Sequence, residues 1–211
     1  MPYMFKQLLE KIIGEKAPGP SPTFSMVHML LALDLMAEKT IGRSKLAYSL
    51  DVGEGAIRTI IGRLKEAGLI TTSKAGCTLT NKGLKLWEEH KSIFKKKSKI
   101  VENELTLGTH NFAILVKNCG HKVKSGMGLR DTAIMAGARS ATTILFQDGR
   151  LVIPSVSDNV TKDFPKAAGQ IVTLLKPEEN DVVIIVSADN MRQAEYGALT
   201  AAWTLINDLR K

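Results

Sequence analysis

Hydrophobic residues recur at helical spacing in two short segments, 43–50 and 56–66. In the second segment they fall at positions i, i+3, i+4 and i+7, so they share one face of a helix. Asp51-Val52-Gly53 separates the segments, and these residue types tolerate the backbone angles of a tight turn. The pattern predicts two short amphipathic helices joined by that turn. Their apolar faces consist of Leu46, Ala47 and Leu50 in the first helix and Ile57, Ile60, Ile61 and Leu64 in the second.

Two strand-like runs follow the second helix. Gly68 stands where a left-handed C-terminal cap is favoured, and residues 69–72 are apolar or β-branched. Residues 73–76 are typical of a turn, and residues 77–80 provide a partner strand. Thr80 or Asn81 can then cap a further helix from Lys82 to about Lys97.

Two more helices are predicted before this segment. Residues 3–13 form a short amphipathic pattern that ends at Gly14, where the stretch GEKAPGPSP contains three prolines that cannot continue a helix. Such a helix can pack against a second copy of the chain or cover its own domain, and both alternatives stand. The next helix begins at Ser21 or Thr23 and runs through Met36, and we expect its apolar residues to support the core.

From Leu105 onward the pattern changes to alternating strands and helices. Asp148-Gly149 between two of the strands is a strong hairpin signal. The order is βαββαβα, and its first six elements match a ferredoxin-like split βαβ arrangement, although other α+β sandwiches share that order. The second half is therefore predicted to be an α+β sandwich. Its expected strands are 111–117, 141–147, 151–154 and 181–187, and its expected helices are 128–138, 164–175 and 191–209.

The first half resembles the winged helix-turn-helix regulators of bacteria and archaea. The resemblance covers residues 22–97 and is carried by IGRSKLAYSL, DVGEG, AIRTIIGRLKEAGLI, TTSKAGCTLT and NKGLKLWEE. It implies that the second helix of the motif is a recognition helix that enters the major groove of double-stranded DNA, and that the hairpin is a wing beside it. The overall plan is also similar to that of leucine-responsive regulators and of an archaeal regulator with an uncharacterised C-terminal domain. No residue-level match extends into the second half.

Candidate DNA contacts follow from this resemblance. On the recognition helix, Arg58, Thr59 and Arg63 are expected to face base edges or phosphates. On the wing, Lys74 is expected to reach the adjacent phosphate backbone. Arginine suits guanine edges because its planar fork donates two parallel hydrogen bonds. Gly62 leaves no side chain in the middle of the exposed face, which permits close approach but lowers helix propensity by about 1 kcal/mol relative to Ala. The predicted contacts are Arg43, Ser44, Arg58, Thr59, Arg63, Lys65 and Lys74.

Charge and length give the domain organisation. The chain has 211 residues and a formal net charge of +8. Residues 1–100 hold 17 Lys and Arg against 9 Asp and Glu, and residues 101–211 hold 12 against 12, so the net charge accompanies the motif. This division favours a polyanionic partner. We expect an N-terminal helix and linker in 1–20, the DNA-binding domain in 21–99, and an effector-sensing or oligomerisation domain in 100–211.

Several classes of function find no support in the sequence. Two cysteines are too few for a disulfide framework, and no leader opens the chain, so we expect a cytoplasmic protein. No apolar run approaches the ~20 residues that a membrane span needs, so no membrane partner is predicted. His110, Cys119, His121 and Asp131 are metal-ligand types, but an extended Cys119-Gly120-His121 alternates faces, and neither a metal nor a cofactor is predicted.

The loop from His121 to Asp131 is the best candidate in the second half for binding a small-molecule effector. It contains glycines and runs into a helix start, where backbone amides attract anions. It lacks the spacing of both common phosphate-binding glycine motifs, so a plain connecting loop is the simpler interpretation. The candidate ligand-binding residues are Lys124, Ser125, Gly126, Gly128 and Arg130.

Catalysis finds no support either, because no nucleophile elbow, HExxH pair or zinc deaminase signature is present, and Asp189 is expected to cap the last helix. The sequence predicts a transcription regulator and not an enzyme: a homodimer that binds specific DNA sites about one helical turn apart and carries a ligand-sensing or assembly domain. Two alternatives remain. The second half could be a small enzyme or cofactor-binding domain, or the winged helix could serve protein contacts.

Overall fold

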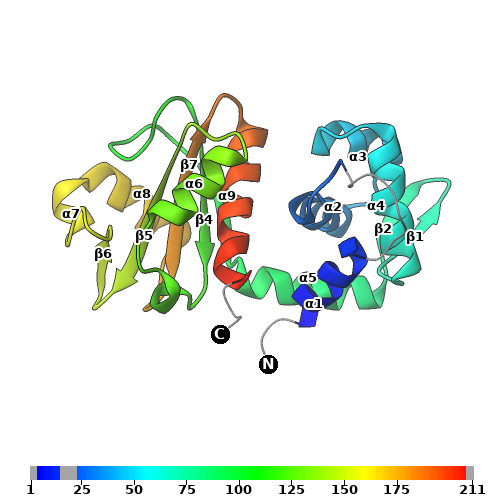
Figure 1. Cartoon of the computed structure of the whole chain (residues 1–211), viewed down its shortest axis with the longest axis horizontal. Coiled ribbons are helices and arrows are strands. Elements are labelled where there is room, and N and C mark those ends of the chain that lie inside the picture. Colours follow the sequence, from blue (N-terminus) through cyan, green and yellow to red (C-terminus); the bar gives the residue numbers. More distant parts are fainter. Residues whose placement is uncertain (1–3, 15–22, 208–211) are drawn as a thin grey trace. The chain divides into compact units, whose positions relative to one another are not determined.

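The structure is a computed structural model that describes residues 4–14 and 23–207. It forms two compact units, residues 1–91 and 92–211 (Figure 1). Most of the predicted proline-rich break and the last two residues of the predicted terminal helix lie outside the described residues.

The N-terminal unit has the helix-turn-helix and hairpin that the pattern predicts. Its helices are α1 (Met4–Gly14), α2 (Met26–Glu38), α3 (Arg43–Leu50), α4 (Glu54–Glu66) and α5 (Asn81–Ile93). Strands β1 (Ile70–Ser73) and β2 (Gly76–Leu79) pair antiparallel, and Ile41 bridges to Cys77 beside them. Asp51 after α3 and Gly68 after α4 both have left-handed backbone angles, as the turn and cap predictions require.

The start of α2 differs from the prediction. Its N-cap is Ser25, because the Ser25 hydroxyl accepts from the Val27 amide and His28 Nδ1 accepts from the Ser25 amide at 2.9 Å. Histidine thus takes the place that Glu or Gln usually fills in a capping box. The core behind this cap is largely apolar, and its fully buried side chains include Met29, Leu30, Leu33, Leu46, Ile57, Ile60, Leu64 and Leu69.

The C-terminal unit is a five-stranded antiparallel sheet with helices on both faces. Its strands are β3 (Lys96–Ile100), β4 (His110–Val116), β5 (Ser140–Gln147), β6 (Arg150–Val152) and β7 (Val182–Ala188). Helices α6 (Met127–Met135) and α9 (Met191–Asn207) cover one face, and α7 (Val160–Asp163) and α8 (Pro165–Leu175) cover the other (Figure 1). Residues 120–122 form a short 3-10 helix. The small residues of α9 pack in the core, as expected, because Ala194, Ala198, Ala201 and Ala202 are completely buried.

The strand order corrects the ferredoxin-like first guess, although the α+β class is confirmed. The order is β3-β4-β7-β5-β6, so β7 lies between β4 and β5. In a ferredoxin-like split βαβ arrangement, β6 and not β7 would lie between β4 and β5. Every residue of β7 is buried, whereas β6 has three residues and pairs with β5 through the predicted Asp148-Gly149 hairpin. The most apolar strand therefore takes the centre, where both of its edges are paired.

The lysine-rich run after α5 is a strand and not the end of a helix. Helix α5 ends at Ile93, and residues 96–100 pair with β4 at the edge of the sheet. Lysines on an edge strand stay solvated and discourage pairing with other chains. Because this run belongs to the second unit, residues 1–91 hold 13 Lys and Arg against 9 Asp and Glu, and residues 92–211 hold 16 against 12. Each unit therefore carries +4, which corrects the predicted concentration of charge.

Candidate functional site

The exposed face of α4 carries both cations and carboxylates, because Glu54 and Glu66 are exposed beside Arg58 and Lys65. Ile57, Ile60 and Leu64 are buried beneath the helix, and Arg58, Thr59 and Lys65 are exposed on the opposite side. The Thr59 hydroxyl donates to the Gly55 carbonyl at 3.1 Å, which leaves its oxygen free to accept a hydrogen bond. This face can therefore offer both charged donors and a hydroxyl to a polar partner.

Gly62 lies in the middle of this face. A Cβ built there would meet nothing within 4 Å, so glycine is not required by packing inside the protein. In a helix interior glycine lowers stability by about 1 kcal/mol relative to alanine. The absent side chain instead lets another molecule approach the backbone of α4 between Arg58 and Lys65.

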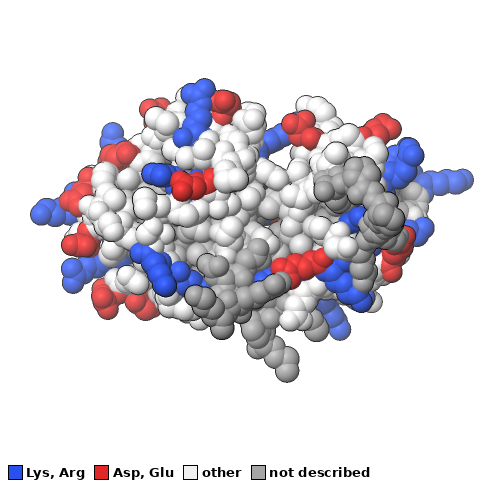
Figure 2. Space-filling model, viewed as in Figure 1, with Lys and Arg blue, Asp and Glu red and all other residues white. Residues whose placement is uncertain are grey.

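Three further predicted residues are exposed on neighbouring elements. Arg43 and Ser44 lie in the first turn of α3, and Lys74 lies in the two-residue tip between β1 and β2. Figure 2 shows Lys and Arg side chains projecting around the wing end of the N-terminal unit. Tyr48, which was not among the predicted residues, is 73% exposed and lies four residues after Ser44 on α3. The spacing of Tyr48 from Ser44 could have indicated this position, because residues four apart share a helix face.

Arg63 is not part of this exposed face. Its Nη1 donates to the carbonyl oxygens of Ile12 (3.2 Å) and Ile13 (2.6 Å) in the last turn of α1, and its guanidinium lies 5.5 Å from the centre of the Phe24 ring. A cation at these carbonyls is favourable because they form the negative end of the helix dipole. Arg63 therefore holds α1 against α4, and its guanidinium is engaged there instead of on the exposed face of the helix. Helix α1 covers its own domain, one of the two alternatives left open.

Two close backbone approaches fix the wing beside α4. A Cβ on Gly83, in the first turn of α5, would lie 2.0 Å from the Leu69 carbonyl oxygen. At Gly76, where the wing turns back, a Cβ would lie 2.6 Å from the backbone of Ile41. Trp87 Nε1 also donates to Asp34 Oδ1 at 2.9 Å and ties α5 to α2. The position of the wing therefore depends on contacts that larger residues would disrupt.

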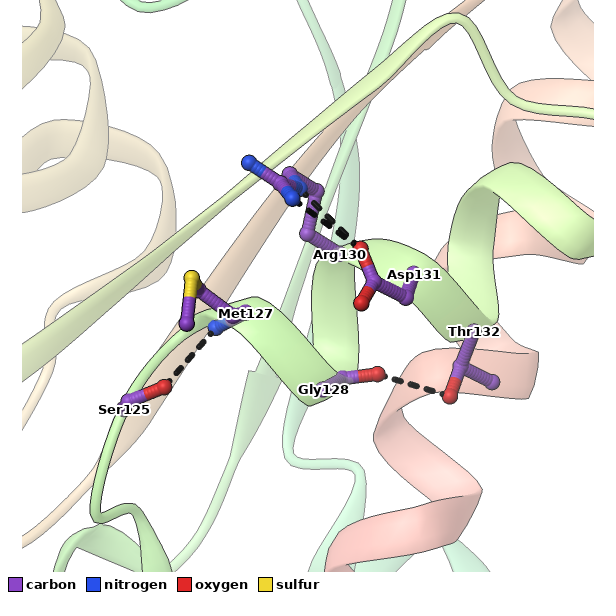
Figure 3. Close-up of polar contacts among 6 residues, drawn as sticks. All are labelled: Ser125, Met127, Gly128, Arg130, Asp131 and Thr132. Atoms are coloured by element: carbon purple, nitrogen blue, oxygen red, sulfur yellow. Dashed lines mark hydrogen bonds and ion pairs between the residues drawn. The ribbon is translucent and has the colours of Figure 1, made fainter.

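The predicted ligand loop forms one wall of a cleft of about 630 Å³ in the C-terminal unit. Lys124, Ser125 and Gly128 line this cleft, together with residues of the 3-10 helix and the end of α9. Gly126 does not line it but packs on Thr143 of β5. Arg130 does not line the cleft and pairs with Asp131 at 3.1 Å (Figure 3). Lining residues that the sequence analysis did not single out for ligand binding include Lys122, Thr132, Thr204 and Leu205.

The remaining candidates have structural positions. Asp189 forms an ion pair with Arg139, and Asn190 caps α9 instead by accepting from the Gln193 amide at 3.0 Å. Among residues 4–14 and 23–207, no group of three or more His, Cys, Asp and Glu side chains is placed to hold a metal ion. Within the same residues, no helix is long and apolar enough to cross a membrane.

These features define the class: a helix-turn-helix unit with a short wing, followed by an α+β unit. Comparison with known proteins supports both parts. Residues 28–94 match the profile of the CggR N-terminal DNA-binding domain, and residues 107–205 match a domain of unknown function, DUF4443. The N-terminal unit is therefore a DNA-binding domain of the kind that regulators carry.

Solved structures that are similar to this chain include the following two. A hypothetical protein from Pyrococcus horikoshii OT3 shares the fold, with 25% identity, a TM-score of 0.70, and coverage of 89% of this chain and 96% of that chain. ZitR from Lactococcus lactis is 24% identical over 41% of this chain and 64% of its own, with a TM-score of 0.30. No curated protein matches the sequence.

Proposed function

We propose that this protein is a sequence-specific transcription regulator that binds double-stranded DNA through α3, α4 and the wing. The observation that carries the proposal is the exposed face of α4, where Arg58, Thr59 and Lys65 surround a glycine that packing does not require. The major groove admits such a helix, and arginine can donate two bonds to guanine there. The match of residues 28–94 to a DNA-binding domain supports the same partner.

The exposed residues divide into two roles. Arg58 and Thr59 are central on the recognition helix and are assigned to base edges. Arg43 lies at the start of α3, Lys65 near the end of α4 and Lys74 at the tip of the wing, so these three are assigned to phosphates along the duplex. Phosphate contacts set orientation and salt dependence, and base contacts set sequence preference.

The protein is proposed to act in the cytoplasm as a homodimer, with the C-terminal unit sensing a ligand or assembling the subunits. A twofold dimer would bind two inverted half-sites with centres about 10 base pairs apart, or a multiple of that spacing. The proposed regulator is not an enzyme. A small molecule recovered with the purified protein should therefore remain unchanged on incubation. Its conversion to another compound would contradict the proposal that the protein is not an enzyme.

The test is selection of genomic fragments by the purified full chain, compared with random duplex over a range of salt concentrations. Selected fragments should bind at least about 10³-fold more tightly than random duplex, and they should contain an inverted repeat. Arg58→Ala should abolish the preference. Weak binding that falls steeply with salt and ignores both sequence and the substitution would show only nonspecific attraction between a basic surface and phosphate.

A further inference from the structure

The cleft in the C-terminal unit is basic. His121, Lys122 and Lys124 line it, and within the described part of the chain none of its lining side chains is acidic. Lys124 is exposed, whereas Lys122 Nζ donates to the Leu205 carbonyl oxygen at 3.0 Å and is thereby held at the cleft. Its volume of about 630 Å³ lies within the range of small-molecule sites, roughly 300–1,000 Å³.

The orientation of the His121 ring is also set by the protein. The Asn180 side-chain oxygen accepts from the His121 amide at 2.8 Å, which identifies the other amide atom as nitrogen. That nitrogen lies 3.1 Å from His121 Nδ1, so Nδ1 accepts from it and Nε2 carries the ring hydrogen. In its neutral form His121 therefore keeps Nε2 as a donor.

Helix α6 begins at the same cleft without a side-chain cap on its N-cap residue, Gly126. The Ser125 hydroxyl accepts from the Met127 amide at 3.2 Å, as Figure 3 shows. Ser125 and Gly128 both line the cleft, so the first turn of α6 opens onto it. A Cβ on Gly128 would meet nothing within 4 Å, which shows that the space beside this turn is open.

A buried hydroxyl lies beneath this turn. Thr143 on β5 is 3% exposed, and its Oγ1 has no hydrogen-bond partner among the described residues. It faces Gly126, where a Cβ would lie 3.4 Å from Thr143 Oγ1. Buried hydroxyls nearly always have a partner, and this one lies directly behind the N-cap residue of α6, although Thr143 itself does not line the cleft.

We propose that the cleft binds a small molecule through a phosphate group placed at the N-terminus of α6, with Lys124 as its exposed cationic contact. A phosphate has several acceptor oxygens, which suit the backbone amides of α6 and the lysines. The cleft is larger than a bare phosphate, and Leu129 and Leu205 provide an apolar wall for an organic part. This inference rests on the assignment of ligand sensing to the C-terminal unit.

The experiment is a titration of the ¹⁵N-labelled full chain with inorganic phosphate, and separately with pyrophosphate, at constant ionic strength. Saturable shifts of the Gly126, Gly128 and Leu129 amides are expected. Lys124→Gln should weaken binding by roughly ten-fold, the effect of losing one charge-assisted hydrogen bond. Arg130→Gln is the matched control, because it changes a nearby cation, on α6, that does not line the cleft.

Gly128→Asp separates binding from folding. A carboxylate in the first turn favours the helix dipole, so the thermal midpoint should stay the same or rise, while phosphate binding is lost by repulsion. Shifts that do not saturate, or equal losses in Lys124→Gln and Arg130→Gln, would overturn the proposal. A short duplex that produces the same saturable shifts would also overturn it, by identifying a nucleic-acid surface. DNA binding measured with Arg58→Ala tests the proposed function separately, because Arg58 belongs to the other unit.

Discussion

Gly62 in the middle of α4 provides a substitution whose effects on folding and on DNA binding have opposite signs. Gly62→Ala adds one methyl group that meets no protein atom within 4 Å, so no strain accompanies it. Alanine should raise the stability of the N-terminal unit by about 1 kcal/mol, because glycine is the poorer helix former by that amount. For a unit of this size the thermal midpoint should rise by about 4–8 °C.

The same methyl group should weaken binding of the selected operator. If α4 lies in the major groove with its backbone close to the DNA, the methyl group displaces the neighbouring base contact. Losing one such contact costs about 1–3 kcal/mol, or roughly 5- to 150-fold in affinity. Fluorescence anisotropy with a labelled operator measures the affinity, and thermal unfolding followed by circular dichroism measures the stability.

Gly169→Ala is the matched control for this substitution. Gly169 is exposed on α8 of the C-terminal unit, and a Cβ there also meets nothing within 4 Å. It should stabilise its own unit by a similar amount and leave operator affinity unchanged. A Gly62→Ala protein that gains stability and binds the operator as tightly as the parent would refute the placement of α4 against DNA.

Three other predictions test the N-terminal unit. Gly83→Ala should destabilise it by at least about 3 kcal/mol in urea unfolding, because the new Cβ would lie 2.0 Å from the Leu69 carbonyl oxygen; parent-like stability would contradict this contact. Arg63→Ala should lower stability by about 1–3 kcal/mol and speed amide exchange in α1 while leaving sequence preference intact, whereas altered base preference would return Arg63 to the DNA surface. Burial lowers the pKa of His28, so the unfolded protein takes up this proton at a higher pH than the folded protein does, and stability should fall as pH drops below about 6.5. The side chain introduced by His28→Gln can still accept from the Ser25 amide. This variant should therefore lose less stability over that pH range in a series of unfolding curves.

The helix-turn-helix could be predicted from sequence because its determinants are local. The spacing of apolar residues fixes the buried face of α4, and Asp51 and Gly68 adopt the left-handed angles that end helices. The start of α2 was missed because a histidine completes its capping box. Strand β3 was not predicted because lysine does not favour strands. This segment forms a strand only because it pairs with β4.

The parts of the site that could not be predicted depend on contacts between distant residues. Arg58 and Arg63 are both basic residues on one helix, and only the docking of α1, about 50 residues earlier in the chain, separates them. Likewise, Lys124 and Arg130 lie close in sequence, yet the packing of α6 on β5 and α9 turns only one of them to the cleft. The strand order follows from the central position of β7, which local pattern does not specify.

The most direct test of the central claim compares Arg58→Ala with Lys74→Ala on a selected operator and all of its single-base variants. If α4 reads base edges and the wing contacts phosphate, Arg58→Ala should remove about 1–3 kcal/mol of discrimination at one base pair of each half-site. Lys74→Ala should weaken every variant equally and reduce the salt slope by about 1. If Arg58→Ala instead weakens all variants equally and leaves the base preferences unchanged, α4 does not read the sequence.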